Sequence, residues 1–170
     1  MERNLAINEE PKMKTTMITA VGMAAAVTIA VPATVHASRE DRQFASPSGN
    51  IRCVFDPYTD PSTSAPTALC QIEDITYTAP PGSVRKVGGG PCEPGSDLPR
   101  LFQLNQGQPA FLTCVYSALD SGFGPWPALA YGQTRSLGTI TCDSEPAGMT
   151  CTDTGSGHFF RVSRDSFQLG

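Results

Sequence analysis

One histidine in the second half of the chain, His158, is the side chain best suited to proton transfer near neutral pH. It follows Ser156 in a Gly-Ser-Gly-His run, and Asp143 and Asp153 stand a few residues upstream. A serine, an imidazole and a carboxylate make up the triad of many hydrolases. However, the run lacks the Gly-x-Ser-x-Gly turn that leads from a strand into a helix. We interpret it as a glycine-rich turn, and a small hydrolase using His158 with Ser156 or a nearby carboxylate is the alternative.

The sequence contains no motif with the residue types and spacing of a metal site or a cofactor site. One histidine beyond His36 cannot supply a His-rich zinc site, and the nearest two cysteines are nine residues apart, without a close pair of zinc ligands. The glycine run Val87–Pro91 lacks the Lys-Ser/Thr that follows in a phosphate-binding loop. We therefore expect no metal and no cofactor, and we assign no catalytic residue.

Three aromatic residues, Phe123, Trp126 and Tyr131, are the best candidates for a binding surface. Trp126 stands between two prolines, which limit the loop entropy lost on binding, and aromatic side chains are favoured anchors at interfaces. The alternative is that Trp126 closes one end of the folded domain. Together with His158, these residues form the predicted binding set.

A secretory signal peptide is predicted at the N-terminus. The stretch Met17–Val31 has no charged residue and follows two lysines, and Val35-His36-Ala37 matches a signal peptidase site. At 15 residues it is shorter than the roughly 20 needed to cross a bilayer core. We expect residues 1–37 to be the signal peptide, cleaved after Ala37, with Met13 as an alternative start and an uncleaved membrane anchor as the alternative to cleavage. Residues 38–170 would then form one exported domain with no stable membrane insertion.

The charge balance of the exported part disfavours nucleic acid as a partner. From Ser38 onward the chain has nine Lys and Arg against 13 Asp and Glu, without a basic cluster. Binding to a phosphate backbone depends on neutralisation by Lys and Arg. A cell-wall polymer or an extracellular protein is the partner class that we expect instead.

All six cysteines lie beyond the predicted signal peptide, which indicates a disulfide framework. Two Thr-rich stretches flank the turn Ser144–Gly148, so a hairpin would place Cys142 opposite Cys151. The same reasoning over a longer Pro/Ser/Thr loop favours Cys53–Cys70, which leaves Cys92–Cys114. Fifteen pairings are nevertheless compatible with six cysteines.

Short stretches of period-two alternation, separated by Gly/Pro turns, predict an all-β fold with little helix. We expect a small antiparallel β-sandwich or barrel-like domain that is held together by three disulfides. The predicted strands are Arg42–Ala45, Asn50–Phe55, Ala68–Glu73, Ile75–Thr78, Leu101–Leu104, Ala110–Ser117, Ala128–Tyr131, Ser136–Cys142, Met149–Thr152 and Phe159–Ser163. A Gly-x-Ile-x-Cys pattern occurs twice, ending at Cys53 and at Cys142, and raises the hypothesis of a duplicated hairpin.

Two loops without apolar periodicity offer another functional hypothesis. Pro57–Pro66 and Thr78–Pro91 are rich in proline and small residues. An exposed, constrained loop of this kind could occupy a protease active site, so a secreted protease inhibitor is a further alternative.

Four motifs together resemble a family of small secreted actinobacterial proteins, common in mycobacteria, that is usually labelled a domain of unknown function. They lie in Phe44–Cys53 (with S-P-S-G-N-I-x-C), Leu129–Gly132, Gly148–Cys151 and Gly155–Arg164 (with G-H-x-F-x-V-S-R). Phe159 replaces the glycine expected in the last motif. The resemblance implies an exported β-rich domain, either retained at the envelope or released, and transfers no catalytic residue. Our leading expectation is a non-enzymatic secreted or cell-wall-associated domain that binds an envelope component or a protein partner.

Overall fold

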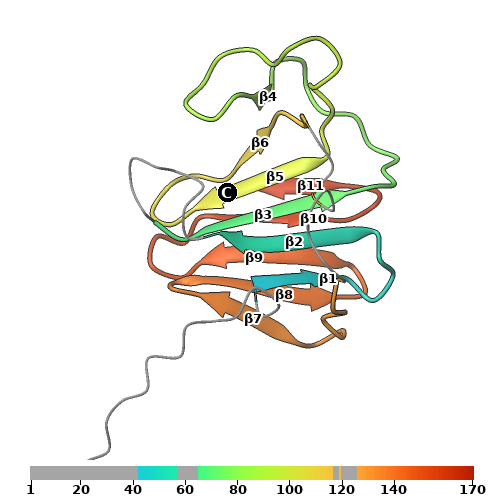
Figure 1. Cartoon of the computed structure of the whole chain (residues 1–170), viewed down its shortest axis with the longest axis vertical. Helices are drawn as coiled ribbons and strands as arrows, with labels where there is room; N and C mark the ends of the chain where they lie inside the picture. Colours follow the sequence, from blue (N-terminus) through green and yellow to red (C-terminus); the bar gives the residue numbers. More distant parts are fainter. Residues whose placement is uncertain (1–41, 57–64, 117–118, 120–125) are drawn as a thin grey trace, which may run out of the picture. The chain divides into compact units, whose positions relative to one another are not determined.

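Two β-sheets make up nearly all of the regular structure, which confirms the expected all-β class (Figure 1). The computed structural model describes residues 42–56, 65–116, 119 and 126–170. In this part of the chain no helix has the length and apolar character to cross a membrane.

The first sheet has the strand order β1-β2-β3-β5-β6-β4. Its strands are β1 (Gln43–Ala45), β2 (Ile51–Asp56), β3 (Thr67–Ile72), β4 (Val84–Arg85), β5 (Leu101–Asn105) and β6 (Phe111–Thr113). Neighbours are antiparallel, apart from β4, which pairs in parallel with β6. A short turn after Asn105 joins β5 to β6 as a hairpin.

The second sheet is an antiparallel meander with the order β11-β10-β9-β8-β7. Its strands are β7 (Thr134–Leu137), β8 (Ile140–Glu145), β9 (Gly148–Asp153), β10 (Phe159–Val162) and β11 (Phe167–Leu169). Gly148 follows the β8–β9 turn with a φ of +134°. A Cβ there would lie 2.2 Å from the carbonyl oxygen of Val162, so this close approach of β9 to β10 requires glycine.

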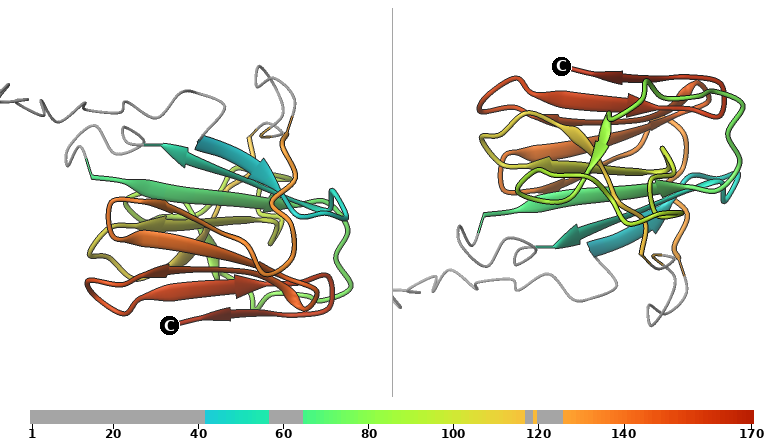
Figure 2. Two further views of the ribbon diagram at one scale, coloured as in Figure 1. Left: turned by 90° about the horizontal axis from the view of Figure 1, so that it is seen from below. Right: turned by 90° about the horizontal axis from the view of Figure 1, so that it is seen from above.

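The core lies between the two sheets, which face each other as layers (Figure 2). Side chains at every second position of β2, β3, β8 and β9 point into it, which explains the period-two pattern. The rings of Phe102 and Phe160, from opposite sheets, have centroids 5.6 Å apart. A smaller apolar cluster of Val54, Leu69 and Leu101 covers the other face of the first sheet.

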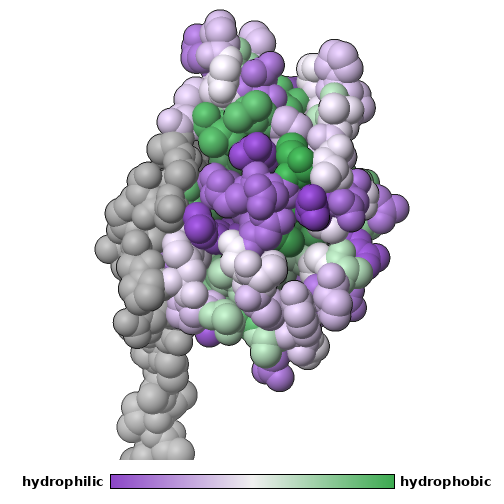
Figure 3. All heavy atoms as spheres, turned by 90° about the vertical axis from the view of Figure 1, so that its right-hand side faces the viewer, coloured by the Kyte–Doolittle hydropathy of each residue, from purple (hydrophilic) through white to green (hydrophobic). Residues whose placement is uncertain are grey.

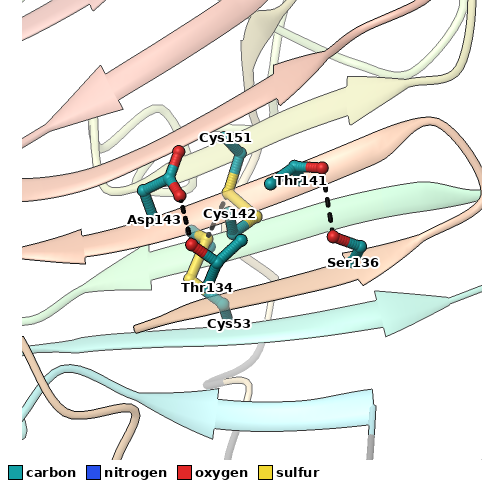
Figure 4. The surroundings of a disulfide bond; sticks show 8 residues. Cys53, Thr134, Ser136, Thr141, Cys142, Asp143 and Cys151 are labelled. Carbon is teal, nitrogen blue, oxygen red and sulfur yellow. Dashed lines mark hydrogen bonds between the residues drawn. A yellow bond between two sulfur atoms is a disulfide. The ribbon is translucent and has the colours of Figure 1, made fainter. Parts of the chain in front are cut away.

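Three disulfides join the pairs that the loop arguments favoured: Cys53–Cys70, Cys92–Cys114 and Cys142–Cys151. Cys53 stands opposite Cys70 on β2 and β3, and Cys142 stands opposite Cys151 on β8 and β9 (Figure 4). Three intramolecular disulfides are typical of proteins from oxidising compartments.

The repeated Gly-x-Ile-x-Cys pattern has the same local structure in both copies. Each glycine has a positive φ, 74° at Gly49 and 59° at Gly138, and precedes a strand that begins two residues later with a buried isoleucine. The third residue of each strand is the cysteine that is bridged to the next strand. The two sheets therefore share one hairpin design.

Several predicted strands differ from the structure. Ile75–Thr78 is not a strand, and Ala128–Tyr131 forms only one isolated bridge, between Ala128 and Ala45. The predicted strand Ser136–Cys142 is two strands, because Gly138 turns the chain between β7 and β8. Alternation did not identify β4 or β11, which are two and three residues long.

Candidate functional site

A polar cleft of about 460 Å³ lies at one end of the sandwich, and we call it the Tyr131 cleft. Turns of both sheets line it: Ser46, Ser48 and Asn50 from β1–β2, Asp74 after β3, Tyr131 before β7, Glu145 and Pro146 from β8–β9, and Ser163, Arg164 and Asp165 from β10–β11. Figure 3 faces this end of the molecule, and hydrophilic side chains occupy the centre of the face. The cleft therefore presents many hydrogen-bonding groups to solvent.

The β1–β2 turn supplies two serine hydroxyls to the cleft. Ser46 Oγ accepts a hydrogen bond from the Ile51 amide at 3.1 Å and lies 3.0 Å from Ser48 Oγ. Gly49, with φ +74°, closes the turn. Because Ser46 is buried and fixes the turn, Ser48 at the exposed tip is held in a defined position.

Asn50 holds the backbone of Asp74 on both sides of the residue. Its Nδ2 donates to the Asp74 carbonyl oxygen at 3.1 Å, and its Oδ1 accepts from the Asp74 amide at 2.7 Å. The exposed Asp74 carboxylate forms no hydrogen bond or ion pair with another described residue. The backbone of Asp74 is thus fixed, and its carboxylate is free to bind a ligand.

Thr76 connects the segment after β3 to the β10–β11 turn. Its amide donates to the Arg164 carbonyl oxygen at 2.9 Å, and its hydroxyl donates to Asp165 Oδ1 at 2.9 Å. The amide and the hydroxyl of Thr76 are thus satisfied by a turn of the other sheet, and Ile75–Thr78 is not a strand. They also join turns of the two sheets along the rim of the cleft.

Tyr131 brings an aromatic ring to the cleft with 46% of its surface exposed. The segment that follows it is fixed beside β8, because Gly132 donates to the Ser144 carbonyl and Ser144 donates to the Gln133 carbonyl. Across the cleft, Glu145 lies 3.6 Å from Arg161, and both side chains are about half exposed. Such a solvated ion pair contributes little to stability.

The other predicted aromatic residues do not meet Tyr131. Trp126 is half-buried and packs against the cluster of Val54, Leu69 and Leu101 on the outer face of the first sheet. It covers part of a sheet face, away from the Tyr131 cleft. Phe123 lies outside the described residues.

Buried Asp153 organises the opposite end of β9 from the cleft. It accepts hydrogen bonds from the Thr139 and Ser156 hydroxyls and from the Gly107 and Gly155 amides, with Ser156 Oγ 2.6 Å and the Gly107 amide 2.7 Å away. Burial raises the pKa of Asp153, but these four bonds outweigh it and hold the pKa far below its usual range. The carboxylate stays ionised and ties together three turns.

His158 does not complete a hydrolase triad in this arrangement. Its backbone amide donates to Ser156 Oγ at 3.3 Å, whereas the Ser156 hydroxyl donates to Asp153. The imidazole forms no hydrogen bond with Ser156 or Asp153 among the described residues. Asp143, the other carboxylate considered, accepts from Thr134 on the exposed face of the second sheet (Figure 4). Ser156 therefore acts here as a turn residue.

A second cleft, of about 410 Å³, is lined by the Pro/Gly-rich loop that contains Thr78–Pro91. This loop is held by the Cys92–Cys114 bridge and by β4. Its tip is a closed turn: Gly89 donates to the Lys86 carbonyl, and Lys86 donates to the Gly90 carbonyl. The tip of the loop is thus a tight turn. A loop that binds a protease active site as a substrate does would be extended. Most of Pro57–Pro66 lies outside the described residues.

The described residues contain one group with metal-like spacing, and its chemistry rules it out as a metal site. Sulfur atoms of Cys53, Cys70 and Cys151 lie within 4.8 Å of one another. All three belong to disulfides and are not thiolates.

The chain matches no family model, no curated protein and no solved structure in the comparisons made.

Proposed function

We propose that this chain is an exported, non-enzymatic β-domain that binds a cell-envelope component in the Tyr131 cleft. The observation that carries the proposal is the convergence of turns from both sheets on one cleft with a half-exposed aromatic ring and many polar groups. Ligand sites are typically concave and combine apolar contact area with a few fixed polar groups.

The sequence motifs support the same location. Four segments of the resemblance contribute to the cleft: Ser46–Ile51, Tyr131, Gly148 and Ser163–Arg164. Another part of the last motif, Gly155–His158, lies at the other end of β9 and forms the turn around Asp153. Other motif residues, such as Phe44 and Phe160, belong to the core.

Export is supported by the predicted signal peptide and by the three disulfides, which persist outside a reducing cytosol. A binding role is favoured over hydrolysis because the Ser156 hydroxyl donates a hydrogen bond to the ionised Asp153 carboxylate and has no imidazole base beside it.

Sedimentation with an insoluble cell-envelope fraction tests the proposal. Purified wild-type protein is expected to sediment with the fraction, and Tyr131→Ala is expected to remain in the supernatant. Tyr116→Ala is the matched control, because Tyr116 is 63% exposed and does not line the cleft. If wild type stays soluble, or if both variants sediment like wild type, the proposal is wrong.

A further inference from the structure

Two charged side chains of the Tyr131 cleft, of opposite sign, form no side-chain hydrogen bond or ion pair with a described residue, whereas the third unpaired charge, Asp165, accepts a hydrogen bond from the Thr76 hydroxyl. The Asp74 carboxylate and the Arg164 guanidinium both line the cleft and are exposed. Neither side chain forms an ion pair with another described residue, whereas Glu145 pairs with Arg161. Asp74 and Arg164 are therefore the strong acceptor and the strong donor of the cleft that no neighbouring side chain engages.

The backbone at both groups is already ordered. Asn50 holds Asp74 through two hydrogen bonds, and Thr76 holds the carbonyl of Arg164. Binding therefore orders only the outer parts of these side chains, which keeps the entropic cost of recognition small.

Tyr131 adds a flat apolar surface beside these polar groups. With 46% of its surface exposed, the ring can cover the CH face of a cyclic molecule, and its hydroxyl remains a donor and an acceptor. The serine hydroxyls of the β1–β2 turn extend the hydrogen-bonding set.

We infer that the Tyr131 cleft takes a neutral saccharide, with a sugar ring on Tyr131 and its hydroxyls shared between Asp74 and Arg164. A cationic ligand would face Arg164, and an anionic ligand would face the carboxylates of Asp74, Asp165 and Glu145. Sugar hydroxyls both donate and accept hydrogen bonds, so a neutral ring satisfies both groups. This inference rests on the proposed function and names its ligand class.

Competition with soluble oligosaccharides of defined charge tests the inference. Wild-type protein bound to the envelope fraction is challenged with maltohexaose, with a chitosan hexamer and with an oligogalacturonate. We expect release by maltohexaose alone, to a similar extent at about 50 and 500 mM salt, because no net charge is neutralised. Release only by a charged oligomer, or by none of the three, overturns the assignment of a neutral saccharide but leaves envelope binding by Tyr131 intact. Failure of wild type to sediment at all overturns the proposed function itself.

Variants locate the contacts. Asp74→Asn and Arg164→Gln are each expected to weaken maltohexaose binding about tenfold, since each removes a hydrogen bond to a charged group. Asp97→Asn and Arg85→Gln are the matched controls, because these residues line the second cleft. Circular dichroism should show that all four variants are folded. If Asp74→Asn and Arg164→Gln then bind maltohexaose as tightly as wild type, the inference is contradicted.

Discussion

Cys70 Sγ lies 3.8 Å from Cys151 Sγ, so the disulfide of one sheet touches the disulfide of the other in the middle of the core. Both cysteines are fully buried. The two hairpins that share the Gly-x-Ile-x-Cys pattern thus meet at their bridges. Covalent links within each sheet and sulfur contact between the sheets hold the centre of a domain that is rich in glycine and proline.

This contact predicts disulfide exchange between the sheets. In Cys53→Ala, the thiolate of Cys70 can attack Cys151 Sγ, forming a Cys70–Cys151 bond and releasing Cys142 as a thiolate. Non-reducing peptide mapping should find the Cys70–Cys151 peptide pair. In Cys92→Ala, used as the control, the native Cys53–Cys70 and Cys142–Cys151 pairs should persist. A Cys53→Ala protein that contains only free Cys70 and the native Cys142–Cys151 bridge would contradict the expectation.

Asp153 should make the domain sensitive to acid. Its folded-state pKa is lowered, so the ionised carboxylate stabilises the fold above its ordinary unfolded pKa of about 3.9. This contribution is lost progressively as the pH falls below that value toward the folded-state pKa. Urea unfolding at a series of pH values should show the decline in wild type.

Asp153→Asn should remove much of this pH dependence and lower the free energy of unfolding at pH 7 by about 2–4 kcal/mol, because four donors lose a charged acceptor. Ser156→Ala, which removes one donor, should have a smaller effect. Unchanged stability of Asp153→Asn at pH 7 would show that the carboxylate does not organise these turns.

Gly148→Ala should destabilise the second sheet and distort the Tyr131 cleft. The added Cβ would meet the Val162 carbonyl at 2.2 Å, at a φ of +134°. We expect a loss of about 2–4 kcal/mol in urea unfolding. Gly107→Ala is the comparison, since its φ is also positive but nothing lies within 4 Å of its Cβ position, and it should cost about 1 kcal/mol. Equal losses in the two variants would refute the close-approach explanation.

His158→Ala should leave envelope binding unchanged, because His158 follows Asp153 at the far end of β9 from the cleft. Sedimentation with the envelope fraction measures this directly. A panel of ester, peptide and glycoside substrates serves as the second readout, and we expect no turnover that depends on His158. Turnover by wild type that is lost in His158→Ala would instead support the hydrolase alternative.

Local patterns in the sequence predicted the hairpins and the cysteine pairs. The turn Ser144–Gly148 sets the register that places Cys142 opposite Cys151, and that information lies within ten residues. The β-class followed from the period-two burial of strands such as β8 and β9. Short edge strands carry too few residues for a period to be visible, so β4 and β11 were missed.

The candidate site was only partly predictable. Tyr131 was singled out as an aromatic anchor, but Asp74 and Asn50 were not, because their contact spans 24 residues of sequence and has no local periodicity. The role of Asp153 was hidden for the same reason, since the Gly107 amide comes from the β5–β6 turn. The packing of Trp126 on the first sheet was not predictable, because proline neighbours indicate a stiff loop but not the surface on which it packs.

The most direct test of the account is nuclear magnetic resonance of the isotope-labelled exported domain, titrated with a solubilised envelope glycan. We predict amide shift changes at Asn50, Tyr131 and Arg164, which surround the cleft, and none at Gly157 or His158. Shift changes confined to the turn around His158, or to the loop held by Cys92, would contradict the assignment of the Tyr131 cleft as the binding site.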